Sequence, residues 1–135
     1  MWSHYADSNR GICLQFRTTS VIQPHFLFAL EVAYVKERPT LDASDQSARD
    51  WPLLLTKAKR WEYEREWRLI EQNRHGARSF PKWDLVGVIL GASISADDAA
   101  EVSRWAAPYC KAERIHRAEP DPRSFTLNVP GLPRE

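Results

Sequence analysis

The stretch KRWEYEREWRLIEQ, residues 59–72, concentrates the side chains of this sequence that are best suited to chemistry. Glu64 and Glu66 are two residues apart, a spacing that places both carboxylates on one face of a β-strand, about 7 Å apart. Such carboxylates repel each other modestly unless a cation or a hydroxyl-bearing ligand lies between them. Arg68 on the same face, or Lys57 just before the stretch, could neutralise them. The spacing therefore permits a carboxylate site, although ordinary amphipathic strands show the same pattern.

The same stretch can be read as a strand or as a helix. As a strand, its aromatic residues share one face and its glutamates share the other. As a helix, it gains one i, i+4 ion pair but leaves Trp61 on the far side. Because aromatic-rich segments favour strands, we expect a strand over residues 64–71. Its alternation predicts Trp67 and Leu69 in the core, with the two glutamates facing a cleft or solvent.

Outside this stretch the reactive residue types are scattered. His4 could hydrogen-bond a ribose or act as a general base, although a histidine near a terminus is more often a structural hydrogen-bonder. The histidines and cysteines lack the close spacing of a zinc site, so no metal is expected, and no glycine-rich phosphate loop is present. Cys13 and Cys110 are isolated in apolar settings, which predicts buried, reduced thiols.

Length and composition are typical of one soluble domain. The 135 residues are 43% hydrophobic and 27% charged, enough for one hydrophobic core. The formal net charge of +1 gives no indication of binding to nucleic acid or to an anionic membrane. No apolar run is long enough to span a bilayer, and the N-terminus lacks the pattern of a signal peptide. We expect a single domain over residues 1–135, a cytoplasmic location and no membrane partner.

Local patterns predict the elements that must position the charged stretch. Four strands are expected, at residues 11–17, 26–35, 85–90 and 125–129. The second of these is apolar on both alternating faces, which suits a strand that is covered on both sides.

Two main helices complete the expected fold. The first begins after Asp50, and its buried stripe is Trp51, Leu54, Leu55 and Ala58. The second begins at Ser95, which caps it together with Asp98, and it packs Val102, Ala106 and Tyr109 against the sheet. Strands and helices do not alternate regularly, so we expect an α+β fold with a small mixed or mostly antiparallel sheet.

Three segments together resemble the bacterial family known as domain of unknown function 2971. The first is WSHYADSNRGIC, with Trp2, His4, Tyr5, Ala6, Asp7, Gly11 and Cys13 at the family positions. The second is KAKRWEYEREWR, with Lys57, Trp61, Tyr63, Glu64, Glu66 and Arg68. The third is the strand LVGVIL, closed by Gly91. The resemblance covers about the first two-thirds of the chain. Family members usually carry a further upstream segment with an Asn-Asp-Pro motif. By that comparison the chain is the C-terminal part of a longer family domain, which predicts dimerisation, aggregation or marginal stability.

A further similarity is to ADP-ribosyltransferase-like folds, which carry a Glu-x-Glu strand whose second glutamate contacts the nicotinamide ribose. By this resemblance Glu66 and Glu64 are the catalytic carboxylates, and NAD is the implied cofactor. Carboxylates suit this chemistry because C–N cleavage passes through an oxocarbenium-like species. Tyr5 or Trp61 would stack on nicotinamide.

Three alternative functions are compatible with the sequence. The first is an ADP-ribosyltransferase-like domain, active or degenerate, in a phage-defence or toxin-like context. The second is a non-enzymatic regulatory module that binds a protein partner through the aromatic strand. The third is a metal-dependent nuclease built from Glu64, Glu66 and Lys57. We expect the site residues His4, Tyr5, Lys57, Glu64, Glu66 and Arg68 to converge.

Overall fold

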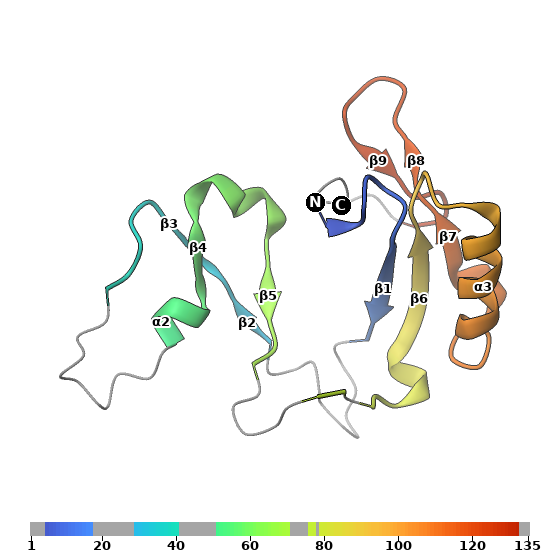
Figure 1. Cartoon of the computed structure of the whole chain (residues 1–135), viewed down its shortest axis with the longest axis horizontal. Helices are drawn as coiled ribbons and strands as arrows, with labels where there is room; N and C mark the ends of the chain where they lie inside the picture. Colours follow the sequence, from blue (N-terminus) through green and yellow to red (C-terminus); the bar gives the residue numbers. More distant parts are fainter. Residues whose placement is uncertain (1–4, 18–28, 41–50, 71–75, 78, 133–135) are drawn as a thin grey trace. The chain divides into compact units, whose positions relative to one another are not determined.

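The computed structural model describes residues 5–17, 29–40, 51–70, 76–77 and 79–132 (Figure 1). The chain divides into two compact units, and each is described by itself. Unit 1 comprises Met1–His25 and Arg78–Glu135, and unit 2 comprises Phe26–Ala77. Mixed helices and small sheets confirm the expected α+β class.

The centre of unit 1 is a three-stranded mixed sheet of order β1-β6-β7. It consists of β1 (Ile12–Phe16), β6 (Leu85–Leu90) and β7 (Ile115–Arg117). The β1 and β6 strands are antiparallel, with Ile12 opposite Leu90, whereas β6 and β7 are parallel. The central strand is almost entirely buried, as its run of aliphatic residues predicts.

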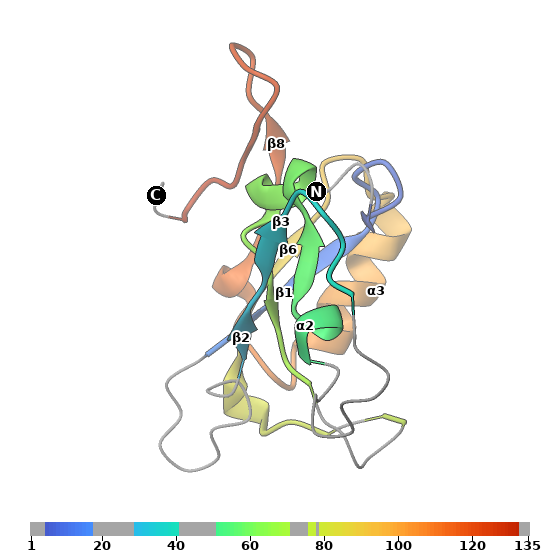
Figure 2. The same ribbon diagram turned by 90° about the vertical axis from the view of Figure 1, so that its left-hand side faces the viewer.

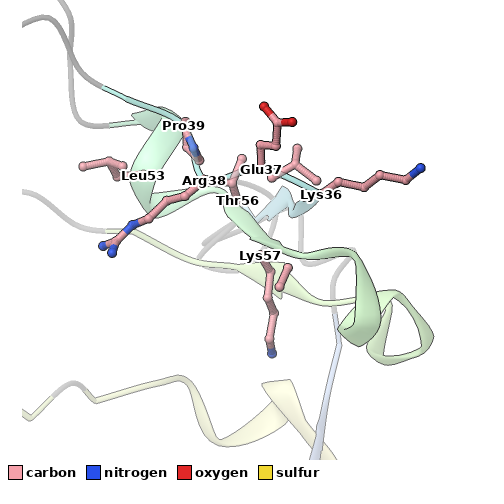
Figure 3. Close-up of a pocket in the computed structure, with 9 residues that line it drawn as sticks. Lys36, Glu37, Arg38, Pro39, Leu53, Thr56 and Lys57 are labelled. Atoms are coloured by element: carbon pink, nitrogen blue, oxygen red, sulfur yellow. The ribbon is translucent and has the colours of Figure 1, made fainter.

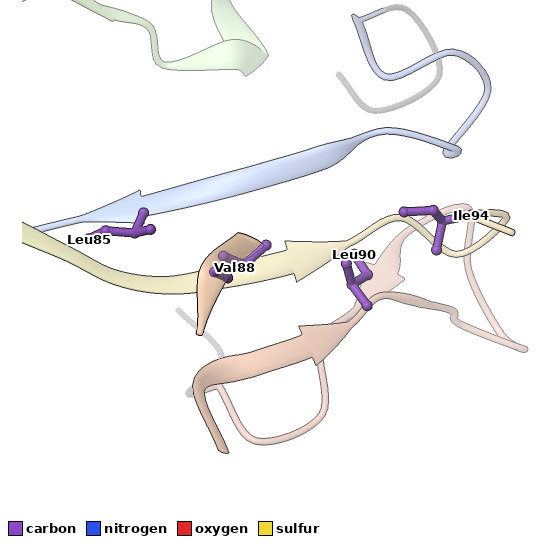
Figure 4. Packing of buried hydrophobic residues seen from close by; sticks show 5 residues of the cluster. Leu85, Val88, Leu90 and Ile94 are labelled. Carbon is purple, nitrogen blue, oxygen red and sulfur yellow. The ribbon is translucent and has the colours of Figure 1, made fainter. Parts of the chain in front are cut away.

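Helix α3 (Ala96–Ala106) forms the crossover between the two parallel strands and covers the sheet. Its cap is confirmed, because the Ser95 hydroxyl accepts a 3.0 Å hydrogen bond from the Asp98 N–H. The buried cluster contains Leu85, Val88, Leu90, Ile94 and Ala106, of which four are labelled in Figure 4. Val102 and Tyr109 pack against this cluster, as expected. Short 3-10 turns, η2 (Lys82–Asp84) and η3 (Ala112–Arg114), precede β6 and β7.

A tight turn before β1 explains the glycine that follows β6, Gly91. Residues 7–9 all have positive φ, a conformation that costs energy for non-glycine residues. The Asn9 carbonyl accepts a 2.9 Å hydrogen bond from the Ser93 N–H, and the Gly91 N–H donates to the Gly11 carbonyl at 2.9 Å. A Cβ at Gly91 would lie 2.1 Å from the Asn9 oxygen. Only glycine therefore lets the turn and the end of β6 approach this closely.

A hairpin follows β7 and completes unit 1. Its strands are β8 (Glu119–Pro120) and β9 (Leu127–Asn128), which pair antiparallel. The strand expected at residues 125–129 is therefore confirmed in part, and it is shorter than expected.

Unit 2 is built from short strands in two pairs. β2 (Leu30–Glu31) pairs antiparallel with β5 (Trp67–Arg68), and β3 (Ala33–Val35) pairs parallel with β4 (Thr56–Ala58). The one-turn helix α2 (Trp51–Leu54) precedes β4, and the 3-10 helix η1 (Lys59–Glu64) follows it. Figure 2 shows β3 and β4 running side by side.

Several expectations for unit 2 are wrong. Of the described residues 29–35 in the segment expected to be covered on both sides, three are exposed, three are half-buried, and Val32, between β2 and β3, is buried. The first expected helix ends at Leu54, which is 41% exposed, because Leu55 accepts a backbone hydrogen bond from Ala33 and the next residues join β4. Pairing with β3 overrides the local helical pattern, so Ala58 belongs to a strand. The expected cap at Asp50 lies outside the described residues.

The charged stretch differs most from its prediction. Residues 59–64 form the 3-10 helix, and within the described part of the expected strand, residues 64–70, only Trp67 and Arg68 are in a strand. The two faces are also reversed: Trp67 and Leu69 are 62% and 51% exposed, whereas Glu64 is buried. The reversal arises because the chain turns at Arg65, whose φ is +44°, so strand alternation does not continue through the stretch.

Cys13 also departs from expectation, because it is exposed while Cys110 is half-buried. On β1, Leu14 and Phe16 face the core, so alternation directs Cys13 to the opposite face. Within the described residues no helix has the length and apolar character required to cross a bilayer.

Candidate functional site

A cluster of two carboxylates and two cations occupies unit 2. Lys57 comes from β4, Glu64 ends η1, and Glu66 and Arg68 lie on either side of Trp67 in the β5 region. The Lys57 ammonium forms ion pairs with both glutamates, and its Nζ lies 2.9 Å from the Glu66 Oε2. Residues that are up to eleven positions apart in the sequence thus form one network.

Arg68 forms the second half of the network. Its Nε donates to the Glu66 Oε1 at 2.6 Å, and its Nη2 donates to the Oε2 at 3.3 Å. A further guanidinium nitrogen donates to the backbone carbonyl of Leu54. This two-point contact fixes the carboxylate plane of Glu66, as arginine–carboxylate forks do.

The charge state of Glu66 follows from these partners. The hydrogen bond from Arg68, supported by the one from Lys57, holds the pKa of Glu66 below its ordinary value of 4.5. The same contact with Glu66 raises the pKa of Arg68 further. The lowered pKa favours the ionised form of Glu66 at neutral pH, and the side chain, which is 28% exposed, is still reachable from solvent.

Glu64 has a different environment. Its side chain is only 4% exposed, and one carboxylate oxygen receives the Lys57 ammonium. The other oxygen, Oε1, has no hydrogen-bond partner among the described residues. A buried carboxylate of this kind depends on its counter-ion, so Lys57 is the residue that makes burial of Glu64 tolerable.

The backbone around Glu66 is held by the neighbouring strands. The Glu66 N–H donates to the Tyr34 hydroxyl at 2.7 Å, and the Glu66 carbonyl accepts from the Val32 N–H at 3.0 Å. The left-handed residue Arg65 ends η1 and brings the chain into this position. Sequence patterns did not single out Tyr34, because its contact bridges 32 positions of sequence.

Aromatic rings border the cluster on one side. The Lys57 ammonium lies 5.4 Å from the centroid of the Trp61 ring, a cation–π distance. The Tyr63 ring centroid is 6.0 Å from that of Trp61. Trp61, predicted to be part of the site, is thus beside the charged residues.

A cavity of unit 2 shares Lys57 with the charge cluster but none of its other members. It has a volume of about 340 Å³ and lies between the segment after β3 and the start of β4 (Figure 3). Its lining residues are Val35, Lys36, Glu37, Arg38, Pro39, Leu53, Thr56, Lys57 and Ala58. Figure 3 shows the Lys57 side chain directed away from Glu37 and Pro39. The ammonium group therefore serves the charge cluster and not the cavity.

Four of the six residues expected to converge do so: Lys57, Glu64, Glu66 and Arg68. Tyr5 belongs to unit 1, where it is 64% exposed. His4 lies outside the described residues. Among the described residues, no group of three or more His, Cys, Asp or Glu side chains is arranged to hold a metal ion.

Comparison with protein families identified a family for this chain. The model of a family described as "Protein of unknown function (DUF2971)" matches residues 1–69, slightly more than half of the chain. The match contains Lys57, Glu64, Glu66 and Arg68. Searches of curated proteins and of solved structures found no match.

Proposed function

The chain belongs to the DUF2971 family of proteins of unknown function, and we propose that its charge cluster is an ADP-ribosyltransferase-like site acting on NAD. The observation that carries this proposal is the state of Glu66, a carboxylate that is ionised, oriented by two cations and 28% exposed. Of the two glutamates, Glu66 is the one whose charged carboxylate a ligand could reach from solvent.

An ionised carboxylate suits cleavage of the nicotinamide–ribose bond. When this C–N bond breaks, its electron pair leaves with the nicotinamide nitrogen and positive charge develops on the ribose. Water or another nucleophile then forms the new bond to the ribose carbon and loses its proton. A fixed anion beside the ribose stabilises the charge that develops in the transition state. In this proposal Glu66 is that anion.

The other residues have supporting roles in the proposal. Glu64 holds Lys57 from the buried side, and Arg68 orients the Glu66 carboxylate. The stacking role of Trp61 or Tyr5 on nicotinamide, and the hydrogen-bonding role of His4, come from the resemblance. The same holds for a phage-defence or toxin-like context, while a cytoplasmic location is proposed from composition.

Two measurements on the purified chain test the proposal. NAD should raise its melting temperature, and nicotinamide release from NAD should exceed the rate in buffer. Glu66→Gln keeps the shape of the side chain but removes its charge, so release should fall by a factor of 100 or more, on the order of a transition-state electrostatic contact. The matched control is Glu62→Gln, which removes the exposed Lys59–Glu62 pair in the same segment and should leave release unchanged.

The outcomes separate catalysis from structure. A chain that NAD does not stabilise and that releases no nicotinamide contradicts the proposal. Loss of release in proportion to a lower folded fraction in Glu66→Gln assigns Glu66 a structural role instead. Stabilisation by NAD without release by the wild-type chain identifies a degenerate site that binds but does not react.

A second candidate is a module that binds a protein partner without catalysis. The reversed faces of the charged stretch favour it, because Tyr63, Trp67 and Leu69 are 59%, 62% and 51% exposed. Several large exposed apolar side chains within one short segment are typical of interaction surfaces. Under this alternative, Trp67→Ser abolishes partner binding, whereas Glu66→Gln has no effect. The nuclease alternative requires stabilisation by a divalent metal ion, which a thermal shift with Mg²⁺ measures.

A further inference from the structure

The tip of the β8–β9 hairpin exposes a large aromatic side chain. Phe125 is 112% exposed relative to the reference residue, the highest value among the exposed large hydrophobic side chains of the described chain. Figures 1 and 2 both show the hairpin extending beyond the sheet of unit 1. Exposure of a complete phenyl ring to water is unfavourable, so burial of this ring against a binding partner would be favourable.

Hydrogen bonds hold the tip in one conformation. The Asp121 N–H donates to the Thr126 carbonyl at 2.9 Å. The Asp121 carboxylate accepts from the Arg123 N–H at 2.7 Å and from the Asn128 side-chain amide at 2.9 Å. The hydroxyls of Ser124 and Thr126 are 2.6 Å apart. A pre-organised loop loses little entropy on binding, which favours association through its tip.

The other end of the hairpin is tied to the sheet. The His116 Nδ1 lies 3.1 Å from the Pro130 carbonyl oxygen. Gly131, with φ of +87°, lies so close to the same ring that a Cβ would be 3.2 Å from it. The Ala118 N–H donates to the Leu90 carbonyl at 2.8 Å. The base of the hairpin is therefore part of the folded unit and presents a defined surface.

That surface contains a cavity of about 520 Å³ beside β9. Its lining residues are Glu119, Leu127, Asn128, Val129, Pro130, Gly131 and Leu132. The lining combines the apolar side chains of Leu127, Val129 and Leu132 with a larger polar surface, which includes the exposed carboxylate of Glu119. The tip carries the complementary pair, an exposed cation at Arg123 and the ring of Phe125.

We propose that this hairpin joins two copies of the chain in a two-fold dimer, with Phe125 of each copy in the β9 cavity of the other. The tip and the cavity lie at opposite ends of one hairpin. Two hairpins packed side by side in opposite directions place both tips against both bases at once, the reciprocal contact that two-fold symmetry requires. Arg123 of each copy then pairs with Glu119 of the other. A second copy is favoured by the charge complementarity of the exposed Arg123 and Glu119, together with the apolar side chains in the cavity lining that Phe125 would contact.

Sedimentation equilibrium of the full chain measures this association. The wild-type chain should dimerise reversibly, and Phe125→Ser should raise the dissociation constant about tenfold or more, as removal of a central anchor does. Trp83→Ser is the matched control, because Trp83 is also a large exposed aromatic residue of unit 1, at 55%, and should leave the constant unchanged. A monomeric wild-type chain at its highest soluble concentration overturns the dimer, as does equal dimerisation of Phe125→Ser.

A charge exchange tests the register of the two copies. Arg123→Glu alone and Glu119→Arg alone place like charges at both contacts, so each variant should dimerise more weakly. Mixing the two variants should restore a heterodimer, because every contact then joins opposite charges. Failure of the mixture to associate more strongly than either variant alone overturns the proposed pairing. Binding of monomeric chain to lipid vesicles through Phe125 also overturns it and assigns the tip to a membrane surface.

Discussion

Lys57 is the residue on which the stability of unit 2 depends most directly. Its side chain is 16% exposed, and its ammonium neutralises Glu64, whose side chain is 4% exposed. Lys57→Met keeps most of the side-chain volume and removes the charge. Glu66 keeps Arg68 as its partner in this variant, but Glu64 loses the cation that the structure provides for it.

The expected cost comes from leaving a carboxylate buried without its counter-ion. Breaking one side of a buried ion pair typically costs about 3–5 kcal/mol, and the partial exposure of Lys57 places the estimate near the lower end, about 3 kcal/mol. Replacing both partners by apolar residues removes the stranded charge. Lys57→Met combined with Glu64→Met should therefore recover most of the lost stability.

The control is the exposed pair Lys59–Glu62, whose side chains are 50% and 56% exposed. Because solvent screens this pair, Lys59→Met should change stability by less than about 1 kcal/mol. Urea unfolding at pH 7 measures all four proteins, with circular dichroism and tryptophan fluorescence compared to detect separate unfolding of the two units.

Two results would refute this reasoning. Equal costs for Lys57→Met and Lys59→Met would show that burial of the Glu64 carboxylate does not depend on Lys57. Additive costs in the double variant would show that Lys57 and Glu64 are not energetically coupled.

Three further predictions concern other parts of the chain. Gly91→Ala should cost roughly 1–3 kcal/mol in urea unfolding, because the added Cβ meets the Asn9 carbonyl; a wild-type midpoint would contradict this close approach. Ser95→Ala should lower the free energy of unfolding by about 1 kcal/mol through loss of the helix cap. Ser103→Ala should lower it less, because the Ser103 hydroxyl only donates to the Ala99 carbonyl within the helix; equal losses would argue against the cap. The lowered pKa of Glu66 means that its contribution to stability is complete above pH 4.5 and is lost as the pH falls through its folded-state pKa; acid unfolding that is unchanged in Glu66→Gln would contradict it.

Local sequence patterns predicted the structure correctly where the stabilising interactions join residues close in sequence, or where a strand is wholly buried. The run from Leu85 to Leu90 predicted β6 because a central strand needs apolar residues on both faces. The cap at Ser95 was readable because donor and acceptor are three residues apart. The proximity of Lys57, Glu64, Glu66 and Arg68 was also foreseen, since buried or crowded carboxylates require cations.

Local patterns could not predict which side chains of the charged stretch are buried and which are exposed. Strict alternation predicted Trp67 inside and Glu64 outside, and the reverse was found. A left-handed residue at Arg65 separates the 3-10 helix from β5, and no simple propensity signals positive φ for arginine. Contacts with Val32 and Tyr34, more than thirty positions away, then hold Glu66 in place.

The sequence by itself therefore determined the α+β class, the central strand, the capped helix and the set of charged residues that meet. Each of these depends on residue types within one element or on a general need for charge compensation. The tertiary structure decided which glutamate is buried, which one is accessible and which aromatic side chains face solvent. Those outcomes depend on pairing between β2 and β5 and between β3 and β4, whose contacts join distant residues and override the preference of each segment alone.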